Sequence, residues 1–263
     1  MSATISSINY CPVKSISFQT IDKCEIKKDI GIIGDRIFAF AKDLDLDKAQ
    51  LFEKSPEERK GKWNKVLTLK NSPVLNKYNF LYKENSLTLT FNDKEILTIN
   101  VNELSEHQLL SNKIIELENS LKEPIVLMKN EEFPFFDTSI SNKVDFINSV
   151  SLINIQSIND FQKKIDKKVE ISRFRGNICI DGIKPWEERN WIGKIIKINN
   201  VSFKVEKNIP RCVAINLKPT TDDNSLNLLQ SLKKTYNHFE MGIYLVALDG
   251  GEINSGDKLE III

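Results

Sequence analysis

The fold is indicated most clearly by residues 194–205, which read Lys-Ile-Ile-Lys-Ile-Asn-Asn-Val-Ser-Phe-Lys-Val. Apolar and polar residues alternate on both sides of Asn199 and Asn200, as is typical of strands with one buried face. Asparagine tolerates the left-handed backbone that a tight turn between two strands requires. The stretch therefore predicts an antiparallel β-hairpin.

Similar patterns recur on both sides of this hairpin. Residues 86–91 alternate in the same way, and residues 95–101 follow after an Asn-Asp turn. Near the C-terminus, residues 242–248 and 258–263 flank a glycine-rich turn. Strands therefore dominate the expected structure.

The chain is expected to form two β-rich units. Residues 122–143 contain two prolines and the run Phe133-Pro-Phe-Phe136 without a clear period, so we place the boundary near them. The predicted fold is mainly β (α+β), with an N-terminal β-barrel-like domain over residues 1–124 and a C-terminal β-barrel over residues 125–263 that carries a few short helices.

Three serines are expected to cap these helices. Ser105 with Gln108 and Ser157 with Asp160 have the spacing of a capping box, and Ser225 precedes a third apolar stripe. The stripes that follow are interpreted as faces that pack into the core.

Composition narrows the classes of function. The chain has 263 residues, 41% of them hydrophobic and 28% charged, and a formal net charge of +1. No strong global field would recruit nucleic acid or an anionic membrane. The N-terminus lacks the basic and apolar regions of a signal peptide, and no window approaches the roughly 20 apolar residues of a membrane span. We therefore expect a cytoplasmic protein without a membrane span or a nucleic-acid partner.

The cysteines and histidines are scattered. The four cysteines stand singly, at Cys11, Cys24, Cys179 and Cys212, and the two histidines are far apart in sequence. Neither a zinc site of the usual spacing nor a disulfide framework is indicated. A cysteine that does chemistry in this chain would act alone.

Two N-terminal stretches offer groups for an anion. Lys14 and Ser15 follow a proline and present a cation beside a hydroxyl, although an exposed lysine is more often only solvated. The turn Gly31-Ile-Ile-Gly-Asp-Arg36 presents a guanidinium that could grip an anion. The alternative for Arg36 is a surface turn with a local ion pair to Asp35.

Two C-terminal stretches add further candidates. Arg175 and Asn177 would share one face of an extended chain and could bracket a polar ligand. Cys212 follows Arg211, whose guanidinium would favour the thiolate that a soft metal requires. The alternative for Cys212 is a small buried hydrophobic side chain.

Taken in order, these motifs resemble the MOSC family, named after the C-terminal domain of molybdenum cofactor sulfurase. The matching motifs are Tyr10-x-Pro-Val-Lys-Ser15, Gly34-Asp-Arg36, Phe174-Arg-x-Asn177, Trp191-x-Gly193, Pro210-Arg-Cys212, Gly242-x-Tyr244 and Gly256-Asp257. The two-part arrangement is similar to the branch with an N-terminal MOSC β-barrel domain, which includes the mitochondrial amidoxime-reducing component and its bacterial relatives.

The resemblance implies a molybdenum cofactor (Mo-molybdopterin) and assigns expected roles. Cys212 matches the cysteine that ligates molybdenum. Contacts to the pterin or its phosphate fall on Lys14, Ser15 and Arg36, and contacts within the MOSC domain fall on Arg175, Asn177 and Arg211. Glu188, in the loop before Trp191, is the candidate for an acidic group near the metal.

Two departures from the family pattern affect the expected pocket. Val150 stands at a position where related members often have proline, within residues 148–151, and Gly176 stands where proline is common. The chain also carries no cysteine-rich ferredoxin tail. Electrons would therefore come from a separate donor protein of the ferredoxin, flavoprotein or cytochrome type.

Three functions remain open from the sequence. The first is a molybdenum-dependent oxidoreductase that reduces N-hydroxylated compounds such as amidoximes, hydroxylamines and N-hydroxylated bases. The second is a sulfur-transfer or cofactor-delivery module in which Cys212 carries a persulfide. Pyridoxal phosphate binding accompanies the family only as a general term, and no domain with a cofactor-binding lysine is recognised here. The third is a β-barrel binding module in which Cys212 is incidental.

Overall fold

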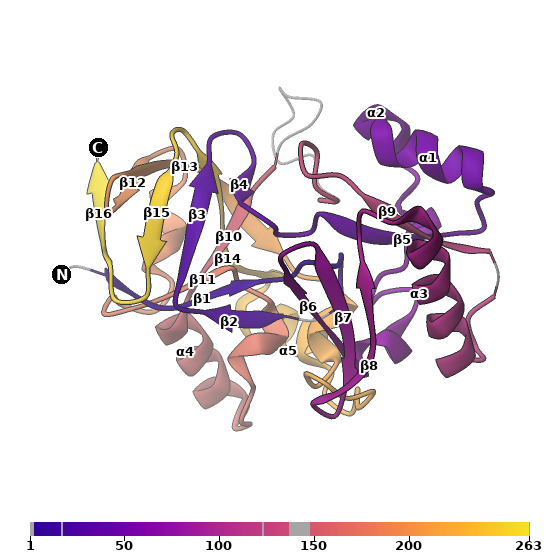
Figure 1. Cartoon of the computed structure of the whole chain (residues 1–263). Coiled ribbons are helices and arrows are strands. Elements are labelled where there is room, and N and C mark those ends of the chain that lie inside the picture. Colours follow the sequence, from indigo (N-terminus) through magenta and orange to yellow (C-terminus); the bar gives the residue numbers. More distant parts are fainter. Residues whose placement is uncertain (1–2, 17, 123, 137–147, 263) are drawn as a thin grey trace.

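The computed structural model describes residues 3–16, 18–122, 124–136 and 148–262. One large sheet runs in the order β11-β10-β14-β13-β12-β16-β1-β2, and an additional β11–β1 pairing closes seven of its strands into a barrel (Figure 1). The strands of this sheet are β1 (Ala3–Tyr10), β2 (Gln19–Ile21), β10 (Val150–Asn154), β11 (Ile178–Asp181), β12 (Ile195–Ile198), β13 (Val201–Pro210), β14 (Glu240–Ala247) and β16 (Lys258–Ile262). The predicted mainly β fold is confirmed.

The predicted hairpin is the β12–β13 pair. Ile198 faces Val201 across the turn, and Asn199 has a φ of 52°. Strand β13 continues for ten residues, beyond the predicted end at Val205, and its pairing with β14 shifts register twice. Such bulges bend a strand. They lie between Val205 and Pro210, directly before Arg211 and Cys212.

The remaining strands form three smaller sheets. Their members are β3 (Lys23–Lys27), β4 (Gly31–Ile32) and β15 (Gly251–Asn254) in one sheet, β5 (Phe38–Lys42) and β9 (Ile125–Lys129) in another, and β6 (Tyr78–Lys83), β7 (Ser86–Phe91) and β8 (Lys94–Asn100) in the third. The predicted strands at residues 86–91 and 95–101 are therefore the β7–β8 pair, although β8 starts one residue earlier.

The two ends of the chain meet in the barrel. Strand β1 pairs with β11 and β16, and β3 pairs with β15. The division into residues 1–124 and 125–263 stays a prediction, and these pairings place the first strands with the C-terminal ones. Within the expected boundary region, residues 123 and 137–143 lie outside the described residues.

Short helices cover the sheets. They are α1 (Leu46–Lys54), α2 (Pro56–Arg59), α3 (Leu104–Leu117), α4 (Ile155–Ile165) and α5 (Leu228–Tyr236), with 3-10 turns η1 (Trp63–Lys65), η2 (Pro73–Lys77), η3 (Ile171–Phe174), η4 (Glu187–Trp191) and η5 (Val213–Asn216). Within the described ranges, no helix is both long and apolar enough to cross a membrane.

The three predicted serine caps are wrong. Helix α3 begins after Glu103 without a side-chain cap, and the caps of α4 and α5 are Asn154 and Asn227, whose side chains accept hydrogen bonds from backbone N–H groups. Ser157 lies inside α4, where its hydroxyl donates to the buried carboxylate of Glu188 at 2.8 Å. This hydroxyl therefore makes a tertiary contact and does not cap the helix.

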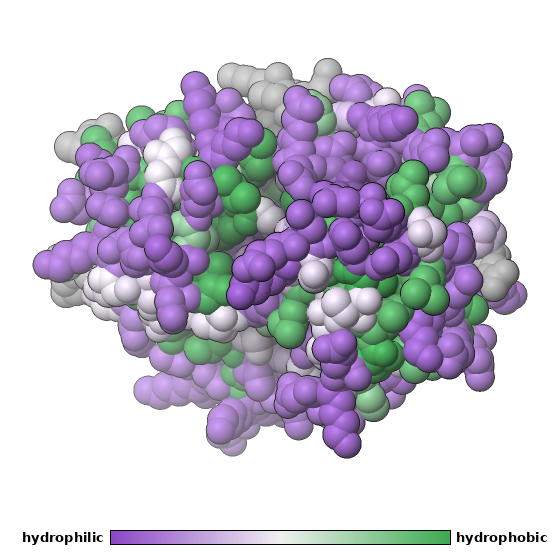
Figure 2. All heavy atoms as spheres, viewed as in Figure 1, coloured by the Kyte–Doolittle hydropathy of each residue, from purple (hydrophilic) through white to green (hydrophobic). Residues whose placement is uncertain are grey.

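Four apolar clusters support the described part of the chain, and the two largest of them are the following. One fills the barrel and includes Ile5, Leu152 and Phe203, and the other lies under the N-terminal sheets and includes Phe38 and Phe80. Burial of these side chains is the main favourable contribution to folding. Hydrophilic residues cover most of the face shown in Figure 2, with smaller groups of hydrophobic residues between them.

Candidate functional site

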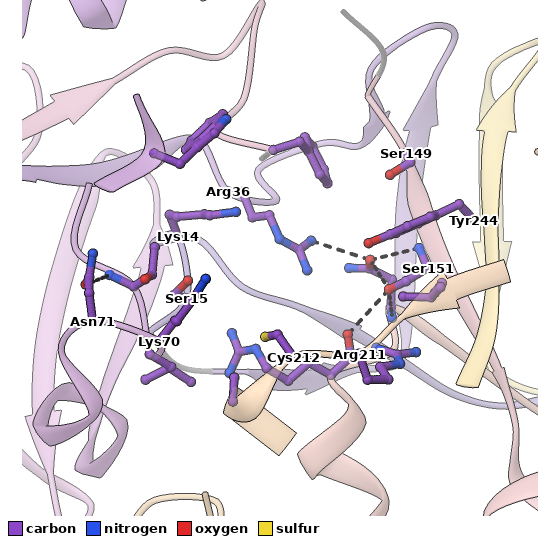
Figure 3. Close-up of a pocket in the computed structure, with 18 of the residues that line it drawn as sticks. Lys14, Ser15, Arg36, Lys70, Asn71, Ser149, Ser151, Arg211, Cys212 and Tyr244 are labelled. Carbon is purple, nitrogen blue, oxygen red and sulfur yellow. Dashed lines mark hydrogen bonds between the residues drawn. The ribbon is translucent and has the colours of Figure 1, made fainter. Parts of the chain in front are cut away.

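A pocket of about 540 Å³ brings together residues from distant parts of the sequence (Figure 3). Its described lining comprises Lys14, Ser15, Arg36, Trp63, Asn64, Thr68, Leu69, Lys70, Asn71, Phe136, Ser149, Ser151, Arg175, Asn177, Ile209, Arg211, Cys212, Ala214 and Tyr244. Five of these residues are lysine or arginine, and no aspartate or glutamate is among them. The lining therefore favours an anion.

The lining contains two distinct parts, the barrel wall and the turn wall. The barrel wall consists of Arg36, Ser151, Asn177 and Arg211, with Asp35 behind them. The turn wall consists of Trp63, Asn64 and residues 68–71. In Figure 3, Lys70 and Asn71 lie on the side of Lys14 and Ser15, Tyr244 and Ser149 lie on the opposite side, and Cys212 lies between.

Lys14 is held inside the protein. Its backbone N–H donates to Phe38 O at 2.7 Å, and its side chain is only 5% exposed. The ammonium lies 5.2 Å from the centre of the Trp63 ring, close enough for a cation–π contact. The alternative of a solvated surface lysine is therefore wrong. Ser15 follows with a φ of 66° and lines the same pocket.

A buried carboxylate organises the barrel wall. Asp35 accepts hydrogen bonds from Cys11 N at 2.8 Å and from Asn177 Nδ2 at 3.2 Å, and it pairs with the guanidinium of Arg36. Asn177 Oδ1 accepts from Ser151 Oγ at 2.7 Å. The local Asp35–Arg36 ion pair exists as the alternative predicted, but it lies in the pocket and not on an open surface turn.

Arg175 reaches the pocket in a way that the sequence did not predict. Its φ of 50° is left-handed, so the chain is not extended between Arg175 and Asn177. The guanidinium donates to Cys11 Sγ at 3.2 Å and lies 5.0 Å from the centre of the Phe18 ring. Burial lowers the pKa of Arg175 and raises the pKa of the Cys11 thiol. Both predicted side chains still line the pocket.

Arg211 binds backbone carbonyl groups. Its Nε donates to Met241 O at 2.8 Å, Nη1 donates to Phe174 O at 2.7 Å, and Nη2 also bonds Met241 O. Burial lowers the pKa of Arg211 to about 10. The side chain thus ties the segment before Cys212 to two neighbouring segments.

Cys212 is the exposed cysteine of the four. It lies just beyond β13, and its carbonyl accepts a hydrogen bond from Ile215 N at 3.2 Å. The other three cysteines are buried, and burial raises the pKa of each, that of Cys24 to about 12. The alternative of a buried hydrophobic side chain is therefore wrong for Cys212. In the part of the chain that is described, no group of three His, Cys, Asp or Glu side chains could hold a metal ion.

Glu188 does not reach the pocket. Its fully buried carboxylate accepts hydrogen bonds from Asn154 Nδ2 at 2.9 Å and from Ser157 Oγ. Burial raises its pKa, although these hydrogen bonds oppose the shift. The expected acidic group near the metal is absent from the described pocket lining, because Glu188 links η4 to the start of α4.

Twelve of the nineteen described lining residues were not among the predicted site residues, and Ser149, Ser151 and Tyr244 are three of them. Ser149 is 2% exposed, and its hydroxyl has no hydrogen-bond partner among the described residues. Ser151 and Tyr244 also face the pocket. The hydroxyls around Val150 and the Gly242-x-Tyr244 motif were available signals for all three. The turn wall carried no such signal.

Comparisons with known proteins find one family model and several relatives. Residues 146–260 match the family model of the MOSC domain. Bovine (Bos taurus) mitochondrial amidoxime reducing component 2 is 28% identical over 109 residues, which are 41% of this chain and 31% of the bovine protein. Molybdenum cofactor sulfurase 2 of Culex quinquefasciatus is 24% identical over 143 residues, which are 48% of this chain and 18% of that protein.

Both aligned stretches thus span less than a third of the relative's own length. Among solved structures, the YUAD protein from Bacillus subtilis aligns with 99% of this chain and 96% of its own, at 10% identity and a TM-score of 0.44.

Proposed function

Because this chain carries a MOSC domain over residues 146–260, we propose that it binds the molybdenum cofactor in the described pocket and reduces N-hydroxylated compounds. Relatives named as an amidoxime reducing component and as molybdenum cofactor sulfurases support an association with this cofactor. The proposal places the protein in the cytoplasm with a separate electron-donor protein of the ferredoxin, flavoprotein or cytochrome type.

The lining fits such a group. The cofactor is anionic at its phosphate and dithiolene ends, and the pocket offers five cations without a carboxylate among its described lining residues. A cofactor that brings its own sulfur ligands needs only one sulfur ligand from the protein, and the exposed side chain of Cys212 could supply it. The unpartnered hydroxyl of Ser149 is a further group that a polar ligand would satisfy.

The residues would then divide the work of binding. Lys14, Ser15 and Arg36 would hold the phosphate and pterin, and Asn177 and Arg175 would contact it from the barrel. Arg211 would act indirectly, since its guanidinium already bonds two carbonyl groups and so fixes the segment that presents Cys212. Bound molybdenum would supply oxygen-atom transfer coupled to two electrons.

The exposed thiol of Cys212 in a cation-lined pocket is the observation that carries this proposal. The test is molybdenum and pterin analysis of protein expressed with molybdate in a cofactor-competent host. We expect near-stoichiometric metal in the wild type and in the buried-thiol control Cys24→Ser. Cys212→Ser should lose the metal and the reduction of benzamidoxime. Folded wild-type protein with neither molybdenum nor pterin would contradict the proposal.

A persulfide-carrying module is the second candidate. An exposed thiol can accept sulfur, and several relatives bear the name molybdenum cofactor sulfurase. This reading expects a Cys212 persulfide, seen by mass spectrometry after incubation with a cysteine desulfurase, in protein free of molybdenum. The reductase proposal does not require a persulfide on Cys212.

A further inference from the structure

The turn wall contributes one lysine, Lys70, to the cations that line the pocket. Lys70 is exposed and lines the pocket, and no hydrogen bond or ion pair of its ammonium is found within the described residues. Each of the four other cations in the lining has protein contacts. Lys14 faces Trp63, Arg36 pairs with Asp35, Arg175 bonds Cys11, and Arg211 bonds Met241 and Phe174.

The backbone that carries Lys70 is fixed. Asn71 Oδ1 accepts from Thr68 N at 2.8 Å, and Asn71 Nδ2 donates to Val66 O at 2.9 Å. Ser72 N also donates to Thr68 O at 2.7 Å. Leu69 is only 4% exposed and anchors the turn from below. The turn therefore holds the position of the Lys70 backbone, while the long side chain keeps an ammonium that can reach a ligand.

The surroundings favour an anionic partner for this ammonium. No carboxylate belongs to the described lining, so an anion there meets no repulsion from the lining itself. Figure 3 shows Lys70 on one side of Cys212, with Ser149 and Tyr244 on the other. This is also the side of Lys14 and Ser15, so a molecule that extends from Cys212 to Lys70 would lie beside the groups proposed to hold the cofactor's phosphate and pterin.

We propose that Lys70 selects substrates that carry an anionic group, a carboxylate or a phosphate, away from the N–OH end. That the bound compound is a substrate rests on the proposed function. The preference for an anion is a property of the pocket and does not depend on that function. The substrate class is N-hydroxylated compounds with a negatively charged substituent, in preference to their neutral counterparts.

The test compares matched ligands by equilibrium binding to the protein as purified with its cofactor. The ligands are para-carboxybenzamidoxime, the uncharged para-carbamoylbenzamidoxime and para-phosphonobenzamidoxime. Quenching of tryptophan fluorescence reports binding, since Trp63 lines the pocket. The readout is the ratio of dissociation constants for the neutral and the charged ligand in each variant.

We expect wild-type protein to bind the carboxylate about threefold to tenfold more tightly than the carboxamide, the range for one partly exposed charge pair. Lys70→Gln should bring the ratio to about one, and Lys70→Arg should retain most of it. Lys94→Gln removes the same charge from an exposed site on β8 and should keep the wild-type ratio. The ratio should fall with added salt. A preference for the phosphonate alone would identify phosphate as the source of the anion.

Equal binding of charged and neutral ligands by the wild type, no binding of either, or a ratio retained in Lys70→Gln would overturn the inference. These outcomes are separate from the fate of the proposed function. Reduction of the neutral compound without any anion preference would retain the reductase and remove the role of Lys70. A Lys70-dependent preference in protein without reductase activity would retain the role of Lys70 in anion binding and remove the reductase function.

Discussion

The barrel wall and the turn wall of the pocket are held by different kinds of interaction. In the barrel wall, Asp35, Arg36, Asn177 and Ser151 bond one another although they lie up to 142 residues apart in sequence. In the turn wall, the side-chain hydrogen bonds of Asn71 join it to residues within five positions of itself. One wall is a tertiary construction and the other is a local turn.

This difference suggests a division of labour. Side chains that bond one another are already oriented before a ligand arrives, which suits a tightly held cofactor. An exposed lysine on a local turn can change without disturbing the core, which suits substrate selection. The comparison can be tested by breaking each wall separately.

The largest effect is expected at Asp35. Asp35→Asn leaves the partly buried guanidinium of Arg36 without its carboxylate. It also places an amide N–H group opposite the donors of Cys11 and Asn177. We expect a loss of about 3 to 5 kcal/mol in the free energy of unfolding, measured with denaturant. The control Asp43→Asn removes an exposed carboxylate 3.9 Å from Lys65 and should cost less than about 1 kcal/mol. Equal losses would show that the barrel wall does not depend on this charge.

A smaller loss is expected at Gly242, which lies next to Met241, the acceptor for Arg211. A Cβ at Gly242 would lie 2.4 Å from Leu152 O, and the residue has a φ of 78°. Gly256 has a φ of 90° with nothing within 4 Å of such a Cβ. Both alanine variants pay for the left-handed backbone with about 1 to 2 kcal/mol. Gly242→Ala should lose about 2 kcal/mol more in thermal or denaturant unfolding, and similar losses would exclude the close approach as the cause.

Much of the pocket lining outside the turn wall was accessible from the sequence. Seven of the eight predicted site residues line the pocket, and Glu188 does not. The motifs succeeded because lysine, arginine, asparagine and cysteine carry recognisable chemistry at fixed spacing. Their roles stay predictions. Glu188 was misplaced because an acidic residue in a loop can serve the fold, here by bonding Asn154 and Ser157.

Local patterns and tertiary placement account for the rest. The β12–β13 hairpin was predictable because alternation and a turn pair are local signals. Closure of the barrel by β1 depends on pairing with β11, about 170 residues away, which no local pattern encodes. The turn wall was missed for the same reason. Nothing in residues 63–71 carries a motif, and only the fold brings Lys70 to Cys212's pocket.

The smallest effect is expected at Asn71, where a substitution weakens the turn wall and leaves the barrel wall unchanged. Asn71→Ala removes the bonds to Thr68 N and Val66 O and should cost about 1 to 2 kcal/mol of unfolding free energy. Asn64→Ala, in the same wall but with no side-chain bond found among the described residues, should cost less than about 0.5 kcal/mol. Because the barrel wall does not share these bonds, Asn71→Ala should weaken the carboxylate preference in the binding assay while molybdenum content stays at the wild-type level. Loss of metal in Asn71→Ala would instead mean that the two walls are coupled, and that the turn belongs to cofactor binding as much as to substrate selection.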